Sequence, residues 1–226
     1  MLRNKILMMA GVTRIVRNGL VLWIDGKEFI NDPPTILLID KSGKGNDATA
    51  YGFDYTSSSG NDGYGRIVFD GIDDYFNCGN SEDLNITGEI TLEAKFQLNK
   101  LGLYQRIIDK DYTAYSLAIW NVNRVTLNIG GMKTNTNLSN TNLALNTDYH
   151  VITQFSTITK KWSIWINGKK DNEGIDDGTI NISAIPFRIG CNSGISQNFN
   201  GKLYFARVYN RALSDSEIIL NFKNSR

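Results

Sequence analysis

The stretch EITLEAKFQL, residues 89–98, decides the fold class because its apolar and polar side chains alternate without error. Successive side chains of a β-strand point to opposite faces of a sheet, so this alternation predicts a half-buried strand. Turn-forming pairs such as Gly130-Gly131 and Asn167-Gly168 suit tight reversals between strands. The sequence therefore predicts an all-β, antiparallel sandwich or barrel. Further strand-like runs occur at residues 20–24, 66–70, 115–120, 124–129, 149–155, 162–166, 187–190 and 203–209.

One helix is predicted near the C-terminal end of the chain. Ser214 can cap it, Glu217 completes a capping box, and Leu213 can pack on Ile218. We expect this helix over residues 214–222. The chain has 226 residues, 41% of them hydrophobic, which is enough to bury the core of a single all-β domain.

Positive charge is concentrated at the start of the sequence. Four of the 24 basic residues precede Asp25, the first acid, which leaves 20 basic and 23 acidic residues in the remainder. This distribution predicts a basic arm over residues 1–17 and one domain over residues 18–226. The domain lacks the continuous positive field that nucleic acid binding needs, so we expect no nucleic acid partner. The basic residues of the arm are Arg3, Lys5, Arg14 and Arg17.

The longest uncharged apolar run, residues 6–12, is short. A membrane-spanning helix needs roughly 20 apolar residues, so no membrane insertion is expected. The same run offers no convincing export signal, and we expect an unprocessed N-terminus.

Cysteine and histidine are scarce. Cys78 and Cys191 could form one disulfide, but without an export signal two packed thiols are the default expectation. His150, the only histidine, lies inside a predicted strand, where a structural role is expected. These three residues cannot supply the four ligands of a structural zinc site.

Seven segments, taken in order, resemble the laminin G-like, concanavalin A-like lectin/glucanase superfamily. The resemblance covers residues 19–222 and is greatest to domains of bacterial secreted proteins and phage structural proteins. It implies a jelly roll of two antiparallel sheets, with a short C-terminal helix at one edge. The segments are GLVLWIDG (19–26), LIDKSGKGNDATAYG (38–52), RIVFDGIDDYFNCG (66–79), ITLEAKFQL (90–98), YHVITQFSTITKKWSIWINGKK (149–170), FRIGCN (187–192) and NFNGKLYFARVYNRALSDSEIILNF (198–222).

Glycoside hydrolysis by this chain is not expected. Retaining enzymes need two carboxyl groups about 5 Å apart, and those of this superfamily carry them at alternate strand positions. The nearest candidates, Glu89 and Glu93, stand four residues apart, and no Glu-x-Asp-x-Glu pattern occurs. The sequence also lacks the Gly-x-Ser-x-Gly elbow of a serine hydrolase. We therefore expect a protein that is not an enzyme and requires no cofactor.

Calcium is the one metal that the resemblance implies. Calcium prefers clustered carboxylate, amide and carbonyl oxygens, which turns can supply. The same residue types also cap turns without any metal, so both interpretations stay open. The acidic segment at residues 171–178 is expected to be a solvated loop. The calcium candidates are Asp40, Asn46, Asp70, Asp73 and Asp74.

A sugar site would combine an exposed aromatic ring with polar hydrogen-bonding groups. Trp120, Trp165 and Tyr204 are the aromatic candidates. Trp165 is out of phase with Trp162, which places the two rings on opposite faces of one strand. The alternative for each candidate is packing within the sandwich.

Two functions remain open. In the first, the protein is a non-catalytic phage virion component, such as a capsid decoration, head-fibre or tail-associated protein. Its arm would bind other virion proteins, and its jelly roll would adhere to surfaces or host glycans. In the second, it is an extracellular carbohydrate-binding module of a secreted adhesin or glycoside hydrolase system. The pattern leaves a homo-oligomer open in both cases.

Overall fold

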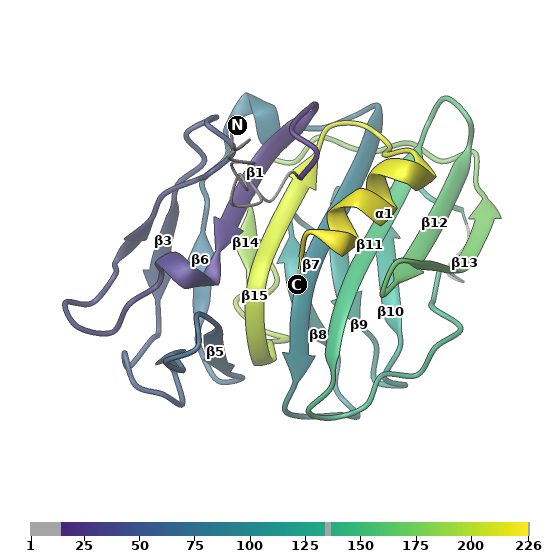
Figure 1. Ribbon diagram of the computed structural model, residues 1–226. Helices are drawn as coiled ribbons and strands as arrows, with labels where there is room; N and C mark the ends of the chain where they lie inside the picture. The colour runs from purple at the N-terminus through teal and green to yellow at the C-terminus, as the bar shows by residue number, and fades with distance from the viewer. Residues whose placement is uncertain (1–14, 134–136, 226) are drawn as a thin grey trace, which may run out of the picture.

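Two antiparallel sheets packed face to face form the protein (Figure 1). The computed structural model describes residues 15–133 and 137–225. The predicted all-β, two-sheet jelly roll with a short C-terminal helix is confirmed. Arg3, Lys5 and Arg14 of the predicted arm lie outside the described residues.

The first sheet has eight strands within the described residues. Its order is β13-β12-β11-β7-β15-β5-β4, and β1 pairs with the same edge of β15 as β5 does. β7 occupies the centre and spans Glu89–Leu98, the segment whose alternation is clearest in the sequence. The other strands are β1 (Leu20–Asp25), β4 (Gly60–Asn61), β5 (Ile67–Asp70), β11 (Asp148–Ser156), β12 (Lys161–Ile166), β13 (Lys169–Ile175) and β15 (Asn200–Tyr209).

The second sheet has seven strands within the same ranges, in the order β10-β9-β8-β14-β6-β3-β2. They are β2 (Leu37–Leu38), β3 (Ala48–Tyr51), β6 (Tyr75–Asn77), β8 (Gln105–Asp109), β9 (Tyr115–Ile119), β10 (Val125–Ile129) and β14 (Arg188–Ile189). Two short 3-10 turns, Gly26–Glu28 and Glu82–Leu84, lie in the connections.

The main core fills the space between the sheets. Phe96 and Val151 of the first sheet, and Leu117 and Leu127 of the second, are all at most 1% exposed within one apolar cluster. These residues alternate with outward-facing ones, as the period of two requires. Cys78 and Cys191 are also buried, and both are free thiols.

The helix α1 (Asp215–Lys223) covers part of the outer face of the first sheet (Figure 1). The Ser214 side chain accepts from the Glu217 backbone N–H, and the reciprocal bond of the capping box is also present. Below the helix, a second apolar cluster contains Ile152, Trp165 and Ile218. Because this cluster belongs to neither inner face, it forms a separate small core. No helix in the described ranges has the length and apolar character needed to cross a membrane.

Two local features differ from the sequence-based expectations. Residues 169–175 form the edge strand β13, so most of the segment expected to be a loop at 171–178 is paired with β12. No residue of this strand is fully buried, so neither face needs an apolar row and the strand lacks apolar alternation. The distribution of basic residues predicted that Ile15 and Val16 belong to the arm, but in the structure both are buried in the second apolar cluster. The Val16 N–H donates to Asn221 Oδ1 at 2.8 Å.

Candidate ligand-binding face

A row of polar residues crosses the outer face of the second sheet. Strand pairing puts Asp109 opposite both Arg188 and Ser116, and Ser116 opposite Asn128. Arg188, Ser116 and Asn128 alternate along their strands with core residues, and Asp109 follows the core residue Ile108, so the row faces away from the sandwich interior. From one edge to the other, the row runs Thr49, Asn77, Arg188, Asp109, Ser116 and Asn128.

Asp109 is the charged centre of this row. It is 2% exposed, and Arg106 Nη1 lies 3.5 Å from its Oδ1. Burial raises the pKa of the Asp109 carboxyl to about 7, although the Arg106 and Arg188 charges act in the opposite direction. The Ser116 hydroxyl accepts hydrogen bonds from Arg106 Nη1 and, at 3.0 Å, from Asn128 Nδ2. Hydrogen bonds therefore join Arg106, Ser116 and Asn128, whereas the buried Asp109 Oδ1 has no hydrogen-bond partner among the described residues.

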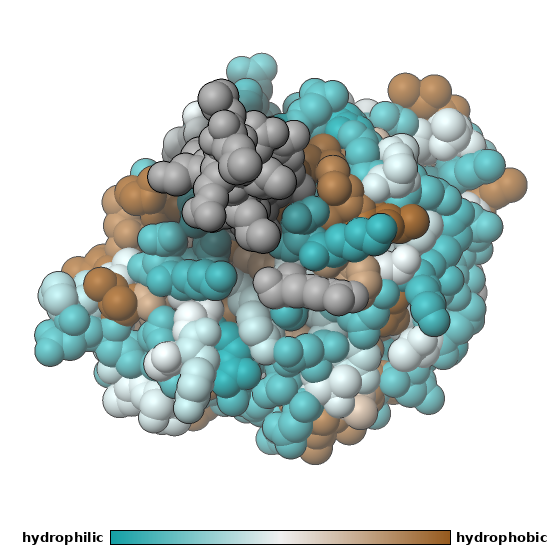
Figure 2. Space-filling view, viewed as in Figure 1, coloured by the Kyte–Doolittle hydropathy of each residue, from teal (hydrophilic) through white to brown (hydrophobic). Residues whose placement is uncertain are grey.

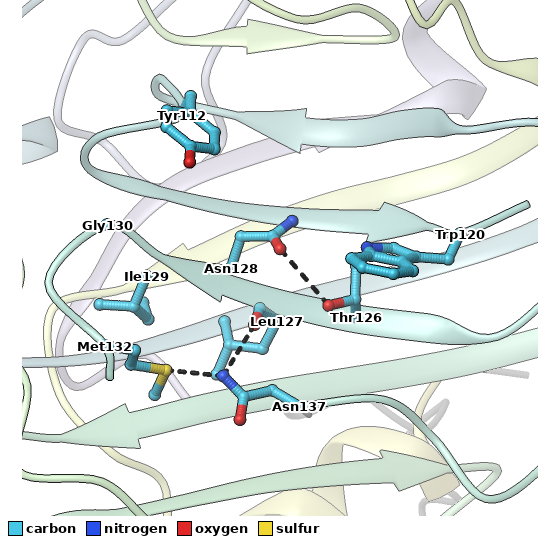
Figure 3. A pocket seen from close by; sticks show the side chains of 9 residues that line it. All are labelled: Tyr112, Trp120, Thr126, Leu127, Asn128, Ile129, Gly130, Met132 and Asn137. Carbon is cyan, nitrogen blue, oxygen red and sulfur yellow. Dashed lines mark hydrogen bonds between the residues drawn. The ribbon is translucent and has the colours of Figure 1, made fainter. Parts of the chain in front are cut away.

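A pocket of about 130 Å³ opens at the Asn128 end of the row (Figure 3). In that view, the Asn128 amide lies between the Trp120 and Tyr112 rings. Tyr112 is 75% exposed, and Tyr104 contacts Trp120 edge-on with ring centroids 5.6 Å apart. The lining residues are Tyr112, Trp120, Thr126, Leu127, Asn128, Ile129, Gly130, Met132 and Asn137.

A second aromatic group stands at the other end of the face. Tyr51 and Tyr75 stack with centroids 4.9 Å apart and an interplanar angle of 10°. Tyr51 is 44% exposed, and the Arg188 guanidinium lies 5.7 Å from the centroid of Tyr75. Rings at both ends and polar groups between them match the chemistry of sugar recognition. The Tyr51–Tyr75 pair was missed from the sequence because the pairing of β3 with β6 is what brings the rings together.

The three aromatic candidates occupy three different places. Trp120 lies on the polar face just described. Trp165 is on the opposite face from Trp162, as predicted, but it is 5% exposed because α1 covers it. Tyr204 is on the first sheet, where its hydroxyl donates to Asp148 at 2.6 Å.

The five calcium candidates separate into two groups. Asp70 ends β5, Asp73 and Asp74 follow it, and the three bring carboxylate oxygens within 4.8 Å of one another. Asp40 instead accepts from the backbone N–H groups of Trp23, Ser42 and Asn46. The Asn46 amide donates to the Val21 carbonyl at 2.7 Å. Asp40 and Asn46 thus stabilise the turn at residues 40–46, and only the three-carboxylate group has the donor set that suits calcium.

A pH-dependent stability is expected from Asp74. This fully buried carboxyl accepts from Ser59 Oγ at 3.0 Å and from the Asp70 N–H at 2.9 Å. Burial raises its pKa to about 7, and the Asp70 and Asp73 charges add to the effect. A folded pKa above the unfolded one favours folding at low pH. As the pH rises from 5 to 8, the free energy of unfolding should therefore fall by on the order of 2 kcal/mol because of the Asp74 carboxyl.

Urea unfolding of the wild type and Asp74→Asn at pH 5 and pH 8, in EDTA, measures this slope. The Asp74→Asn variant should lose less free energy of unfolding between the two pH values than the wild type, and an equal loss would refute the assignment.

Calcium at the carboxylate group should raise the wild-type melting temperature more at pH 8 than at pH 5. An equal melting temperature in calcium and in EDTA at both pH values would refute the calcium prediction.

The carboxylates considered for hydrolysis are held in structural contacts. Glu93 is fully buried beneath α1, with its Oε1 2.9 Å from Arg207 Nη1 and 2.7 Å from His150 Nε2. Glu89 accepts a hydrogen bond from Ser156. His150 therefore has a structural contact, in line with its expected role.

The chain belongs to the concanavalin A-like lectin/glucanases superfamily, whose family model matches residues 70–219. No curated protein matches the chain. A Trypanosoma rangeli sialidase structure shares the fold with a TM-score of 0.62 and 17% identity, covering 90% of this chain and 32% of the sialidase. The chain thus spans about a third of that enzyme.

Two further structures share the fold. The binding domain of Paraclostridial Mosquitocidal Protein 1 gives a TM-score of 0.59 at 15% identity, over 91% of this chain and 52% of that one. A putative carbohydrate binding protein from Bacteroides ovatus gives 0.50 at 21% identity, over 60% and 41%. The fold is therefore one that is found in both sialidase-like enzymes and binding domains.

Proposed function

We propose that this chain is a non-catalytic carbohydrate-binding domain and that its ligand contacts the polar face of the second sheet. The observation that carries the proposal is the Trp120 pocket, where an aromatic ring adjoins the Asn128 amide and the hydrogen-bonded row behind it. A pyranose can place its apolar face on a ring while its hydroxyl groups bond to amides, hydroxyls and carboxylates. The lectin-like fold supports this assignment as an analogy.

The non-catalytic part of the proposal is supported by Glu93. An acid catalyst must reach the substrate, and the Glu93 carboxylate is enclosed by Arg207, His150 and α1. Release of reducing sugar by the purified chain would contradict it.

Replacing Trp120 by alanine should weaken binding of neutral glycans by about tenfold or more, because the ring supplies the apolar contact surface. A glycan array identifies ligands of the wild type, and titration calorimetry measures the change. Tyr64→Ala is the matched control, since Tyr64 is an 81% exposed ring that does not belong to this pocket's lining. Equal affinity of Trp120→Ala and wild type would rule out the Trp120 pocket as the site.

We also propose that the domain functions in a phage virion, as a capsid decoration, head-fibre or tail-associated protein. Ile15 and Val16 pack on the outer face of the first sheet, so the polar face and the first described residues lie on opposite sides of the sandwich, which would let the domain bind glycans with one side and other virion proteins with the other. The alternative is an extracellular module of a secreted adhesin or glycoside hydrolase system. Neighbouring genes distinguish the two: capsid and tail genes favour the virion, whereas export or polysaccharide-degradation genes favour the module.

A further inference from the structure

The strand β2 ends the second sheet with an exposed apolar stretch. β2 pairs with β3 on one side, and among the described strands none lies on its other side. Residues 36–39 read Ile-Leu-Leu-Ile, and of these only Leu38 belongs to the core. The side chains of Ile36, Leu37 and Ile39 are 48–61% exposed. Figure 2 shows brown apolar patches at the left end of the molecule, the end at which Figure 1 places β3.

The free edge of this stretch also presents backbone hydrogen-bonding groups. The Ala50 N–H donates to the Ile36 carbonyl at 2.8 Å, and the register places Leu37 opposite Thr49. In an antiparallel ladder, successive residues bond alternately toward one side of the strand and toward the other. The N–H and carbonyl groups of Leu37 and Ile39 therefore point away from β3. They form a template on which one more strand can pair.

The other three ends of the two sheets are covered or polar. Beside β10, at the opposite end of the second sheet, the Ser139 N–H donates to the Val125 carbonyl at 2.8 Å, so a following segment covers that edge. On the first sheet, β13 begins with two lysines, and β4 consists of a glycine and an asparagine. Charged residues and covering segments protect edges against association. The stretch at residues 36–39 has no charged residue, so β2 is the edge suited to a partner strand.

The sequence of the stretch favours a second copy of this chain as that partner. Ile-Leu-Leu-Ile has the same order in both directions, so two copies can pair antiparallel about a two-fold axis. Leu37 of each copy then lies opposite Ile39 of the other, with about four backbone hydrogen bonds between the copies. Charge does not oppose this contact, because the adjacent Lys41 is already paired with Asp25 at 3.2 Å. No unpaired charge is buried.

We propose that the chain forms a homodimer in which β2 pairs antiparallel with β2 of a second copy. The exposed apolar side chains and the paired backbone of both copies bury on the order of 1,000 Å² in total, the lower end of specific interfaces. The dimer is therefore weak, with a dissociation constant in the micromolar range.

The pairing joins the two second sheets into one continuous sheet, which leaves both polar faces on the same side. Two Trp120 pockets could then bind one glycan-bearing surface together, which raises the overall affinity without a new contact. This consequence rests on the proposed function, whereas the pairing of β2 does not.

Sedimentation velocity of the full chain over a micromolar concentration series tests the pairing. We expect a monomer–dimer equilibrium for the wild type. Leu37→Lys puts a charge opposite Ile39 of the second copy and should raise the dissociation constant about tenfold or more. Ile158→Lys is the matched control, because Ile158 is 77% exposed in the turn between β11 and β12, and it should leave the equilibrium unchanged. Circular dichroism should show the wild-type fold for both variants, since neither residue is buried.

A mixture of two charged variants tests the register. Ile39→Glu alone should weaken association as Leu37→Lys does. An equimolar mixture of the two should associate about tenfold more tightly than either alone, because the introduced lysine of one copy faces the introduced glutamate of the other. A wild type that is monomeric throughout the series, a dimer that Leu37→Lys leaves intact, or a mixture that fails to associate would each overturn the proposal. Glycan binding by the Trp120 pocket is measured separately on the monomer, so the proposed function can stand if the dimer fails.

Discussion

Replacing Glu93 by alanine is expected to lower the free energy of unfolding by about 3–5 kcal/mol, because it leaves Arg207 buried without its counter-charge. Glu93 Oε2 also accepts from Asn221 Nδ2 at 2.9 Å and from the Tyr209 hydroxyl at 3.3 Å. Asn221 belongs to α1, so one carboxylate joins the helix to two strands of the first sheet. Urea unfolding followed by circular dichroism measures the loss.

Two controls separate the ion pair from general damage to β7. Glu89→Ala removes a partly exposed carboxylate from the same strand and should cost less than about 1 kcal/mol. Replacing Glu93 and Arg207 together by leucine should cost less than the sum of the two single changes, because no charge is left unpaired. Additive losses in the double variant would show that the two charges are not coupled.

The same site predicts an acid-sensitive helix. Burial alone would raise the pKa of Glu93, but the Arg207 charge and the His150 hydrogen bond outweigh it and lower the pKa below its usual value. A carboxyl with a lowered folded pKa contributes stability above its unfolded pKa and loses it as the pH falls through the folded pKa. The Glu93 contribution is therefore lost as the pH falls from about 4.5 through the lowered folded pKa, whereas the Asp74 contribution is lost as the pH rises toward a folded pKa of about 7.

The elements with clear period-two alternation could be predicted from the sequence. The segment at residues 89–98 coincides with β7, and the predicted helix at 214–222 lies within one residue of α1 at each end. β8 was missed because its sequence, QRIID, does not alternate and a register shift interrupts its pairing with β9. β13 was missed because an edge strand with two exposed faces needs no apolar residues.

The candidate face could be predicted only in part, because it depends on strand register. Trp120 was found as an aromatic candidate. Asp109 and Asn128 belong to the same row only because β8 and β10 both pair with β9, which places both residues beside Ser116. Arg188 joins the row from a strand about 80 residues later in the chain. The position of Trp165 shows the opposite case: alternation gives the correct face of β12, but only tertiary packing puts α1 over it.

Truncating Phe76 to alanine is expected to cost about 3–5 kcal/mol, since it opens a cavity where the two sheets meet. Phe76, on β6 of the second sheet, is fully buried. Its ring centroid lies 5.0 Å from Phe53, 5.4 Å from Phe29 and 5.9 Å from Phe69 of β5 in the first sheet. The ring therefore links strands of both sheets through edge and tilted contacts, which stabilise more than area burial alone.

Urea unfolding of Phe76→Ala should show a lower midpoint with little change in slope, because the unfolded state exposes nearly the same surface. Phe76→Leu keeps most of the volume and should cost about 1–2 kcal/mol, which separates the cavity from loss of the ring. Ile158→Ala, at a 77% exposed apolar position, is the surface control and should change stability by less than about 0.5 kcal/mol. If Phe76→Ala were no more destabilising than Ile158→Ala, the aromatic cluster could not be what holds this end of the sandwich together.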